Sequence, residues 1–210
     1  MKKILVAVVG LVAVGCGGTH TDPTMNQMNP NQMGLNYPSG PFGYAQGSVI
    51  QNIQFSGKID PAGAAGTNPY TSLPMQPISL AQYYNDPSVK FLYLSGVARW
   101  CAPCNDEQNE VSAAQTKYEP KGVRFLEAVI EGGTRGVPAT ETDIDLWQAV
   151  HQLHVGIAID PTDAIHQYAD IAAFPLNMIV RTSDMQIVYM ATGELPPPNG
   201  LDDTLAQFVQ

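Results

Sequence analysis

Two cysteines separated by two residues, Cys101 and Cys104, are the side chains of this sequence with the clearest chemistry. They lie in the segment 100–104, WCAPC, which follows an apolar run at 89–94 and precedes a segment with helical character. At the first turn of a helix, free backbone N–H groups and the positive end of the helix dipole favour a thiolate. Cys101 is therefore predicted to be a nucleophile near neutral pH. Cys104 lies one turn further on and is close enough to form a disulfide with it, so the pair predicts thiol-disulfide exchange.

The composition supports a folded domain and excludes one class of partner. The chain has 210 residues, of which 44% are apolar, so at least part of it can bury a core. The formal net charge is −9 and the sequence has no basic cluster that would bind phosphates, so we expect no nucleic-acid partner. The third cysteine, Cys16, stands alone near the N-terminus.

The N-terminus has the pattern of an export signal. Lysines at positions 2 and 3 precede a short apolar run at 4–14, and Gly15 and Cys16 follow. The segment 13–16, AVGC, resembles the lipobox of bacterial lipoproteins, in which cleavage leaves a cysteine that carries the lipid. We therefore predict a signal peptide at 1–15 and lipidation of Cys16, with an ordinary secretory signal as the alternative. Gly17 in place of an aspartate resembles the outer-membrane sorting rule of enteric bacteria.

The segment 16–47 is predicted to be a flexible tether between the lipid and a domain at 48–210. Its first thirty or so residues are polar and interrupted by prolines, so they cannot bury enough apolar surface to offset the entropy of ordering. Methionines at positions 25, 28 and 33 are soft ligands of the kind that bind copper, but they lack the dense repetition of a metal site.

The domain at 48–210 alternates between strand-like and helix-like segments. This order predicts an α/β fold with a mixed central sheet, helices on both faces, and an early strand or hairpin extension at 48–55. The other expected strands are 90–97, 123–130, 155–159, 176–180 and 186–190. The expected helices or helical turns are 78–84, the segment from the cysteine pair to about 118, 143–153, 164–168 and 201–209.

These elements and motifs resemble the thioredoxin-like superfamily, and within it the TlpA/ResA type of exported thiol-disulfide oxidoreductases. The resemblance covers about 48–210. It rests on WCAPC after a strand, on Glu107 three residues after Cys104 (the pattern WCxPCxxE), and on Pro175 at the start of a later strand. The strand-like segment from Ser48 and the insertion before Pro175 favour the same branch of the superfamily.

The resemblance implies a binding surface for protein substrates beside the disulfide. In the family, the proline at the position of Pro175 is cis, and the bend exposes preceding backbone groups with which an extended substrate segment can pair. Trp100, Phe174 and Pro175 are therefore expected to bind substrate, with a plain strand-initiating proline as the alternative. Phe174 and Leu176 are bulkier than the residues that often flank this proline, so the resemblance does not extend to the substrate preference.

The proton acceptor for Cys104 has two candidates. Thioredoxins carry a buried aspartate six residues before the first cysteine; here Ser95 has that position, and a serine is no base near pH 7. By resemblance, Glu107 is expected to accept the proton, and a solvated glutamate in the first helical turn is the alternative. Glu127 interrupts an apolar strand, and burial would raise the pKa of its carboxyl. Asn109 replaces a proline that frequently kinks this helix in the family, which predicts a straighter helix.

Two histidines raise an alternative class of function, a copper-binding chaperone with a thioredoxin fold. His151 and His154 are three residues apart in one helical segment, so with Cys101 and Cys104 they would be able to form a metal site. Copper-delivering relatives typically use CxxxC and one distant histidine, whereas this chain has CxxC. We therefore expect no metal and no cofactor other than the redox-active Cys101–Cys104 disulfide. A structural disulfide in an inert lipoprotein is a third hypothesis.

Together these features predict an enzyme, a membrane-tethered thiol-disulfide oxidoreductase of the cell envelope. Cys101 is expected to be the nucleophile and Cys104 the resolving cysteine. The protein is expected to face the periplasm from its lipid anchor, with the outer membrane favoured over the inner one. Its partners would be protein thiols and disulfides. By resemblance we also expect a membrane electron donor, a reducing direction and a role of the cytochrome-maturation type.

Overall fold

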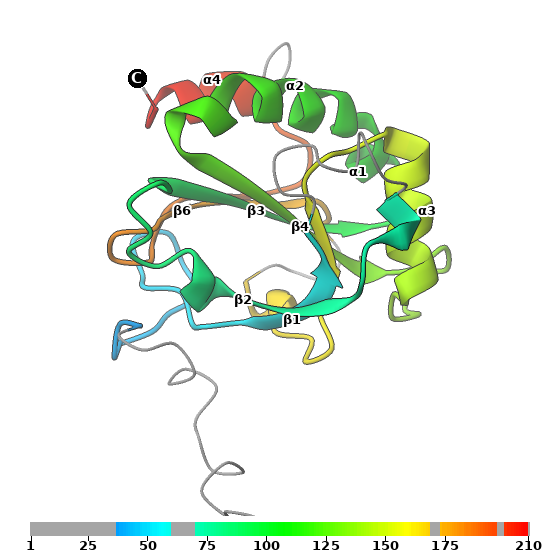
Figure 1. The fold of residues 1–210 in the computed structure, drawn as a ribbon, viewed down its shortest axis with the longest axis horizontal. Helices are drawn as coiled ribbons and strands as arrows, with labels where there is room; N and C mark the ends of the chain where they lie inside the picture. The colour runs from blue at the N-terminus through cyan, green and yellow to red at the C-terminus, as the bar shows by residue number, and fades with distance from the viewer. Residues whose placement is uncertain (1–36, 60–69, 169–172, 197–199, 210) are drawn as a thin grey trace, which may run out of the picture.

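The computed structural model describes residues 37–59, 70–168, 173–196 and 200–209. The predicted signal peptide, Cys16 and the first part of the predicted tether lie outside the described residues. Within the described ranges, each helix is too short or too polar to cross a bilayer. Figure 1 shows the described part of the fold in colour.

A mixed sheet of seven strands forms the centre of the fold (Figure 1), as the sequence predicts. Its order is β2-β1-β5-β4-β3-β6-β7. β4 pairs in parallel with β3 and β5. β6 pairs in antiparallel with β3 and β7, and β1 pairs in antiparallel with β2 and β5. The strands are β1 (Gln54–Lys58), β2 (Gln76–Ser79), β3 (Phe91–Ala98), β4 (Val123–Glu131), β5 (Gly156–Ile159), β6 (Leu176–Arg181) and β7 (Gln186–Thr192).

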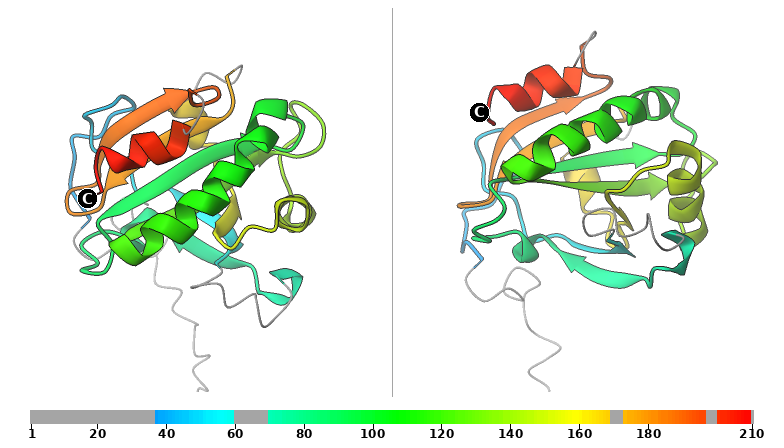
Figure 2. Two further views of the ribbon diagram at one scale, coloured as in Figure 1. Left: turned by 90° about the horizontal axis from the view of Figure 1, so that it is seen from above. Right: turned by 45° about the horizontal axis from the view of Figure 1, so that its top comes forward.

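Helices cover this sheet unequally. The steps from β3 to β4 and from β4 to β5 run in the same direction across the sheet, and because such crossovers are right-handed their helices lie on the same face. In Figures 1 and 2, α2 and α4 lie side by side over that face. α3 lies to the right of β4 in Figure 1. The opposite face holds the short 3-10 helix η6. The helices are α1 (Ala102–Asp106), α2 (Gln108–Tyr118), α3 (Glu141–His151) and α4 (Gly200–Ala206), with 3-10 helices η3 (Tyr70–Ser72), η4 (Leu80–Gln82), η5 (Glu119–Lys121) and η6 (Ile165–Gln167).

The central strand β3 is buried along almost its whole length, which explains why its sequence is a continuous apolar run and not an alternating one. Its Gly96 faces η6 so closely that an added Cβ would lie 2.9 Å from Ile165 Cγ2. Gly57 in β1 has the same role at the hairpin, because a Cβ there would lie 2.4 Å from the carbonyl oxygen of Ile157 in β5. These two glycines let neighbouring elements approach the sheet closely enough to close the core.

Residues 37–47 pack against the domain, although they were predicted to be part of the tether. The Tyr37 hydroxyl donates to the Ile50 carbonyl at 2.9 Å, and its ring meets Tyr84 edge to face at 5.7 Å. The Gly47 N–H donates to the Ile187 carbonyl on β7 at 2.8 Å. The predicted boundary at residue 48 therefore moves toward the N-terminus, and the packed part of the chain begins no later than Tyr37.

The predicted early elements are displaced along the chain. The strand expected at 48–55 is β1, which begins at Gln54, and the helical turn expected at 78–84 is divided between β2 and η4. The buried side chain of Asn52 explains the change. Its Oδ1 accepts from Ser79 Oγ at 2.7 Å and from the Ala81 N–H at 3.0 Å, which holds the start of η4 in place.

Candidate active site

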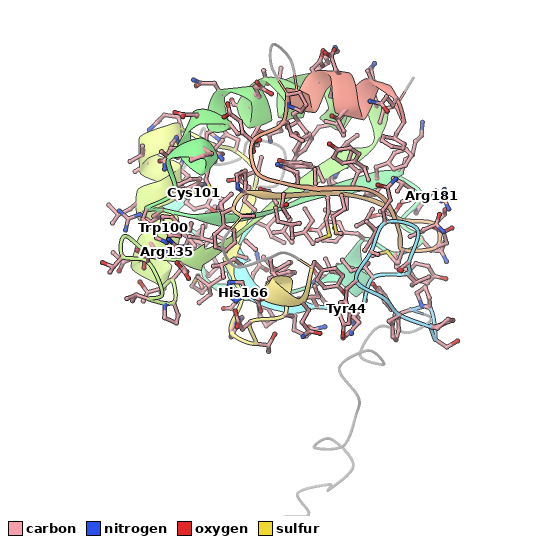
Figure 3. The ribbon with its side chains drawn as sticks, turned by 180° about the vertical axis from the view of Figure 1, so that it is seen from behind. Tyr44, Trp100, Cys101, Arg135, His166 and Arg181 are labelled. Carbon is pink, nitrogen blue, oxygen red and sulfur yellow. A yellow bond between two sulfur atoms is a disulfide. The ribbon has the colours of Figure 1, made fainter. Side chains whose placement is uncertain are left out.

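The two cysteines of the CxxC motif lie where β3 ends and α1 begins (Figure 3, Cys101 labelled). Cys101 is the N-cap residue of α1, and its Sγ accepts a hydrogen bond from the Cys104 N–H at 3.2 Å. Pro103 lies in the first turn, where a missing N–H leaves no helical bond unmade. Cys101 and Cys104 form a disulfide across a Cα–Cα distance of 5.3 Å. The expected pairing at a helix N-terminus is therefore confirmed.

The two sulfur-bearing residues differ in access. Cys101 retains 3% of its surface, whereas Cys104 is completely covered. A partner that reaches this disulfide therefore meets Cys101 first.

The helix after the disulfide is interrupted and not straight, contrary to the expectation from Asn109. α1 ends at Asp106, Glu107 is the junction, and α2 begins at Gln108. The Gln108 side chain turns back and donates from Nε2 to the Cys104 carbonyl at 2.8 Å. A side chain thus binds a helical carbonyl at the interruption, and no proline is needed to produce it.

Glu107 points into the protein from this junction. Its Oε1 accepts from the Leu195 N–H at 2.7 Å, and Asn177 Nδ2 on β6 lies 3.3 Å from its Oε2. Burial raises the pKa of the Glu107 carboxyl, and the hydrogen bonds from Leu195 and Asn177 oppose part of that rise. The alternative of a solvated first-turn glutamate is therefore wrong, since only 5% of the residue is exposed.

Asn177 and Tyr93 also belong to this buried network, and neither was predicted as a site residue. The Tyr93 hydroxyl on β3 donates to Asn177 Oδ1, while the amide group of Asn177 faces Glu107. Burial raises the pKa of Tyr93 well above its usual value, so it remains a neutral donor. The available signal is the asparagine itself, which interrupts the apolar run of β6 as Glu127 interrupts that of β4.

Glu127 is fully buried on β4, directly opposite Ser95 of β3. Its Oε2 accepts from the indole Nε1 of Trp147 on α3 at 2.7 Å. Burial raises the pKa of Glu127 to about 7, an effect that the hydrogen bond from Trp147 and the nearby Gln108 amide group oppose. The predicted raised pKa is thus confirmed. Trp147 was not predicted as a site residue. Its indole N–H gives the buried carboxyl a hydrogen-bond donor, which makes a glutamate tolerable at this position.

The Cys101 end of the site has a rim formed by Trp100, Phe174 and Pro175, and Figure 3 labels Trp100 and Arg135 close to Cys101. Trp100 Nε1 donates to Glu131 Oε2 at 2.5 Å, and the Arg135 guanidinium lies 5.1 Å from its ring centroid. The Phe174 ring meets Trp100 edge to face at 6.4 Å. Because Phe174 meets Trp100 and directly precedes Pro175, the three residues expected to bind substrate lie together. The Phe174–Pro175 peptide bond is cis, as the family pattern implies.

A cavity of about 310 Å³ adjoins this rim. Its walls include Glu131, which holds Trp100, and His166, whose ring lies 5.9 Å from that of Phe174. Ala139 and Ile159 supply apolar wall between them.

The histidines considered for copper bind protein groups. His151 Nε2 lies 3.0 Å from Asn105 Oδ1 of α1, and its ring stacks edge to face on Trp147 at 4.4 Å. At His154 the bond that the structure shows is to the backbone, whose carbonyl accepts from Gln115 Nε2 at 2.6 Å. In the part of the chain that the structure describes, no group of three or more His, Cys, Asp and Glu side chains is arranged to hold a metal ion.

Two comparisons of the sequence find no match. No protein-family model matches it. No curated protein sequence matches it either.

Solved structures, in contrast, match most of the chain. A thiol:disulfide interchange protein from Bacteroides sp. aligns with a TM-score of 0.54 and 18% identity, over 79% of this chain and 90% of that one. The thioredoxin domain of a thiol-disulfide oxidoreductase from Bacteroides vulgatus aligns with a TM-score of 0.54 and 16% identity, over 80% and 100%. A 2-Cys peroxiredoxin from Plasmodium vivax aligns with a TM-score of 0.56 and 11% identity, over 78% and 79%.

These likenesses show the fold. Because interchange proteins and a peroxiredoxin match about equally well, the fold does not by itself select an activity, and the cysteine arrangement must do so. The chain has a thioredoxin-like fold, with the Cys101–Cys104 disulfide at the end of β3 and a cis Phe174–Pro175 bond before β6.

Proposed function

We propose that this protein is a thiol-disulfide oxidoreductase that exchanges disulfides with protein substrates. The observation that carries the proposal is the disulfide at the start of α1, in which Cys101 is the more accessible partner. The Cys104 N–H that points at Cys101 Sγ is placed to stabilise a thiolate on that sulfur after reduction.

The reducing direction proceeds in two exchanges. The Cys101 thiolate attacks one sulfur of a substrate disulfide, forms a mixed disulfide with it, and expels the other substrate sulfur as a thiolate. Cys104 then loses its proton and attacks Cys101 Sγ, which forms the Cys101–Cys104 disulfide and expels the second substrate sulfur. Two electrons pass from the protein to the substrate, so a dithiol donor must reduce the protein before the next cycle.

Glu107 is the proposed acceptor of the proton that Cys104 loses. It lies three residues after Cys104, which is the spacing that places two side chains on one side of a helix. Its buried carboxyl has a raised pKa, so it is a stronger base than an exposed glutamate. The N–H groups of Leu195 and Asn177 point at its oxygens and stabilise the ionised form that must accept the proton.

The proposed substrate surface is the rim of Trp100, Phe174 and Pro175. The Pro175 carbonyl accepts from the Gly193 N–H at 2.7 Å, so this carbonyl is already paired within the protein. An extended substrate segment would therefore pair with the backbone that precedes Pro175. The neighbouring cavity beside Glu131 and His166 is the place for a substrate side chain.

The proposed location is the cell envelope. The export-signal pattern at 1–16 supports it, with Cys16 as the lipid-bearing residue and a tether after it. Electrons would come from a membrane partner, and a role of the cytochrome-maturation type follows the TlpA/ResA resemblance. Metabolic labelling with palmitate tests the anchor: we expect label on the native protein and none on Cys16→Ala.

A trapping experiment tests the activity. The Cys104→Ser variant keeps the attacking thiol and removes the resolving one, so we expect it to accumulate mixed disulfides with envelope proteins. Cys101→Ser is the matched control and should trap none. The native protein should reduce insulin with dithiothreitol, and failure of both assays would sink the proposal. A reduction potential near roughly −270 mV would indicate a reductant, and one near roughly −120 mV an oxidant.

A further inference from the structure

Glu127 lies beneath the CxxC motif, and the proposed exchange steps do not use it. It is fully buried on β4, in register with Ser95 on β3 and Ile157 on β5. Trp147 on α3 donates to its Oε2, and the Gln108 side chain at the start of α2 reaches its carboxyl. Gln108 also donates to the Cys104 carbonyl at 2.8 Å. One side chain therefore connects Glu127 with the backbone of the resolving cysteine.

The hydrogen bonds at this place fit a neutral carboxylic acid. Among the described residues, no donor in hydrogen-bonding geometry meets Glu127 Oε1 or Gln108 Oε1, and both oxygens are buried. In this arrangement an ionised carboxylate would leave both oxygens without a hydrogen, which is unfavourable for a buried acceptor. A proton on Glu127 Oε1 satisfies that oxygen and gives the Gln108 oxygen a donor.

The second buried carboxyl of the site has the opposite surroundings. Glu107 receives N–H groups from Leu195 and Asn177 on its two oxygens, which is a site for a charged carboxylate. Two carboxyls so placed divide into a charged one and a neutral one, because the charge on Glu107 opposes ionisation of Glu127.

The other groups around Glu127 do not offset its charge. On β3 the titratable neighbour is Tyr93, whose hydroxyl stays neutral. α3 presents the uncharged indole of Trp147, and β5 presents Ile157 in the adjacent register position. Glu107 at the junction of α1 and α2 is therefore the charged group that faces it, and it repels a second negative charge.

We propose that Glu127 is a protonated positioning residue in the oxidised protein, and that it holds the Cys104 turn through Gln108. When Glu127 ionises, the Gln108 amide group turns its N–H toward the new carboxylate and leaves the Cys104 carbonyl. Ionisation of Glu127 thereby links pH to the cysteine pair. This inference deepens the proposed oxidoreductase function and rests on it for its redox consequence.

Glu127→Gln tests the inference, because an amide supplies the donor and the acceptor of a neutral acid but cannot ionise. Infrared spectra of the oxidised protein, labelled with ¹³C-glutamate, show whether a protonated glutamic acid is present. We expect a carboxylic C=O band at pH 6 that disappears as pH rises through about 7 and is absent from Glu127→Gln. An absent band in the native protein, or the same band in the variant, overturns the inference whether or not the protein is an oxidoreductase.

The second measurement is the reduction potential of the Cys101–Cys104 disulfide, determined in glutathione buffers from pH 5.5 to 8.5. A cysteine thiolate near Glu127 disfavours its ionisation, so reduction should take up an extra fraction of a proton near neutral pH. We expect an inflection in the native profile that is lost in Glu127→Gln and kept in Glu119→Gln, a control on the 3-10 helix η5. Identical profiles for the native protein and Glu127→Gln contradict the inference. Should Glu127→Gln fail to fold, Trp147→Phe must shift the inflection to higher pH, and an unshifted inflection contradicts it equally.

Discussion

Trp147 Nε1 donates to Glu127 Oε2 at 2.7 Å in the interior of the domain, and this bond connects the inserted helix α3 to the strand beneath the CxxC motif. The same helix reaches α1 through His151, which bonds Asn105 at 3.0 Å. Asn105 in turn donates from Nδ2 to the Cys101 carbonyl at 2.7 Å. α3 therefore supports the cysteine pair from two directions.

Trp147→Phe should raise the pKa of Glu127 above its native value of about 7, because the carboxylate loses its indole donor. The apolar packing is largely kept, so we expect a loss of about 1 kcal/mol in the free energy of unfolding at pH 5. Urea denaturation across pH measures both effects. In the double variant with Glu127→Gln, Trp147→Phe should no longer change the pH dependence of the free energy of unfolding. If it still does, the change does not come from Glu127.

Stability should fall as pH rises through the neutral range. The folded pKa of Glu127 is raised from 4.5 to about 7, so the folded state holds a proton that the unfolded chain has released. This contribution is fully present below pH 4.5, declines from there and is lost above about pH 7, by roughly 3 kcal/mol in total. Glu127→Gln should match the native protein near pH 4.5 and exceed it in stability at pH 8. Equal urea midpoints at pH 8 would exclude Glu127 as the cause.

Glu107→Gln should slow the resolving step and leave the first attack intact. An amide cannot accept the Cys104 proton, so we expect mixed disulfides to accumulate and their release to slow by about 10²-fold. Acid-quenched reactions with a disulfide peptide measure the two rates separately. Glu110→Gln is the matched control, since Glu110 lies one turn away on α2 and bonds the Leu201 N–H. An unchanged release rate in Glu107→Gln would exclude it as the acceptor.

A buried ion pair under α3 should respond unequally to removal of its two ends. Lys58 on β1 is fully buried, and its Nζ lies 2.7 Å from Asp145 Oδ1 and 3.3 Å from Glu141 Oε1. Asp145→Asn leaves a buried ammonium with one exposed partner, so we expect a loss of about 3 kcal/mol in the free energy of unfolding. Lys58→Met leaves only carboxylates that water can reach, so its loss should be smaller. Equal losses in urea denaturation would contradict this account.

Local spacing in the sequence determines the chemistry and most of the architecture. The CxxC pair and Pro175 are identified by neighbours a few residues away, and the apolar run of β3 by continuous burial. The strands from β3 to β7 and the helices α2, α3 and α4 lie close to their predicted ranges for the same reason. The early elements were displaced because Asn52 bonds Ser79, and no local pattern shows a contact between residues so far apart.

The protonation of the two buried glutamates is decided only by the tertiary structure. The sequence presents both Glu107 and Glu127 as candidate proton acceptors, with Glu107 preferred by resemblance, and no local pattern shows which carboxyl carries a proton. The fold brings Leu195 to the first, 88 residues away, and Trp147 to the second, 20 residues away. A carboxyl pKa depends on burial and on the donors that reach its oxygens, and these are properties of packed neighbours and not of sequence neighbours.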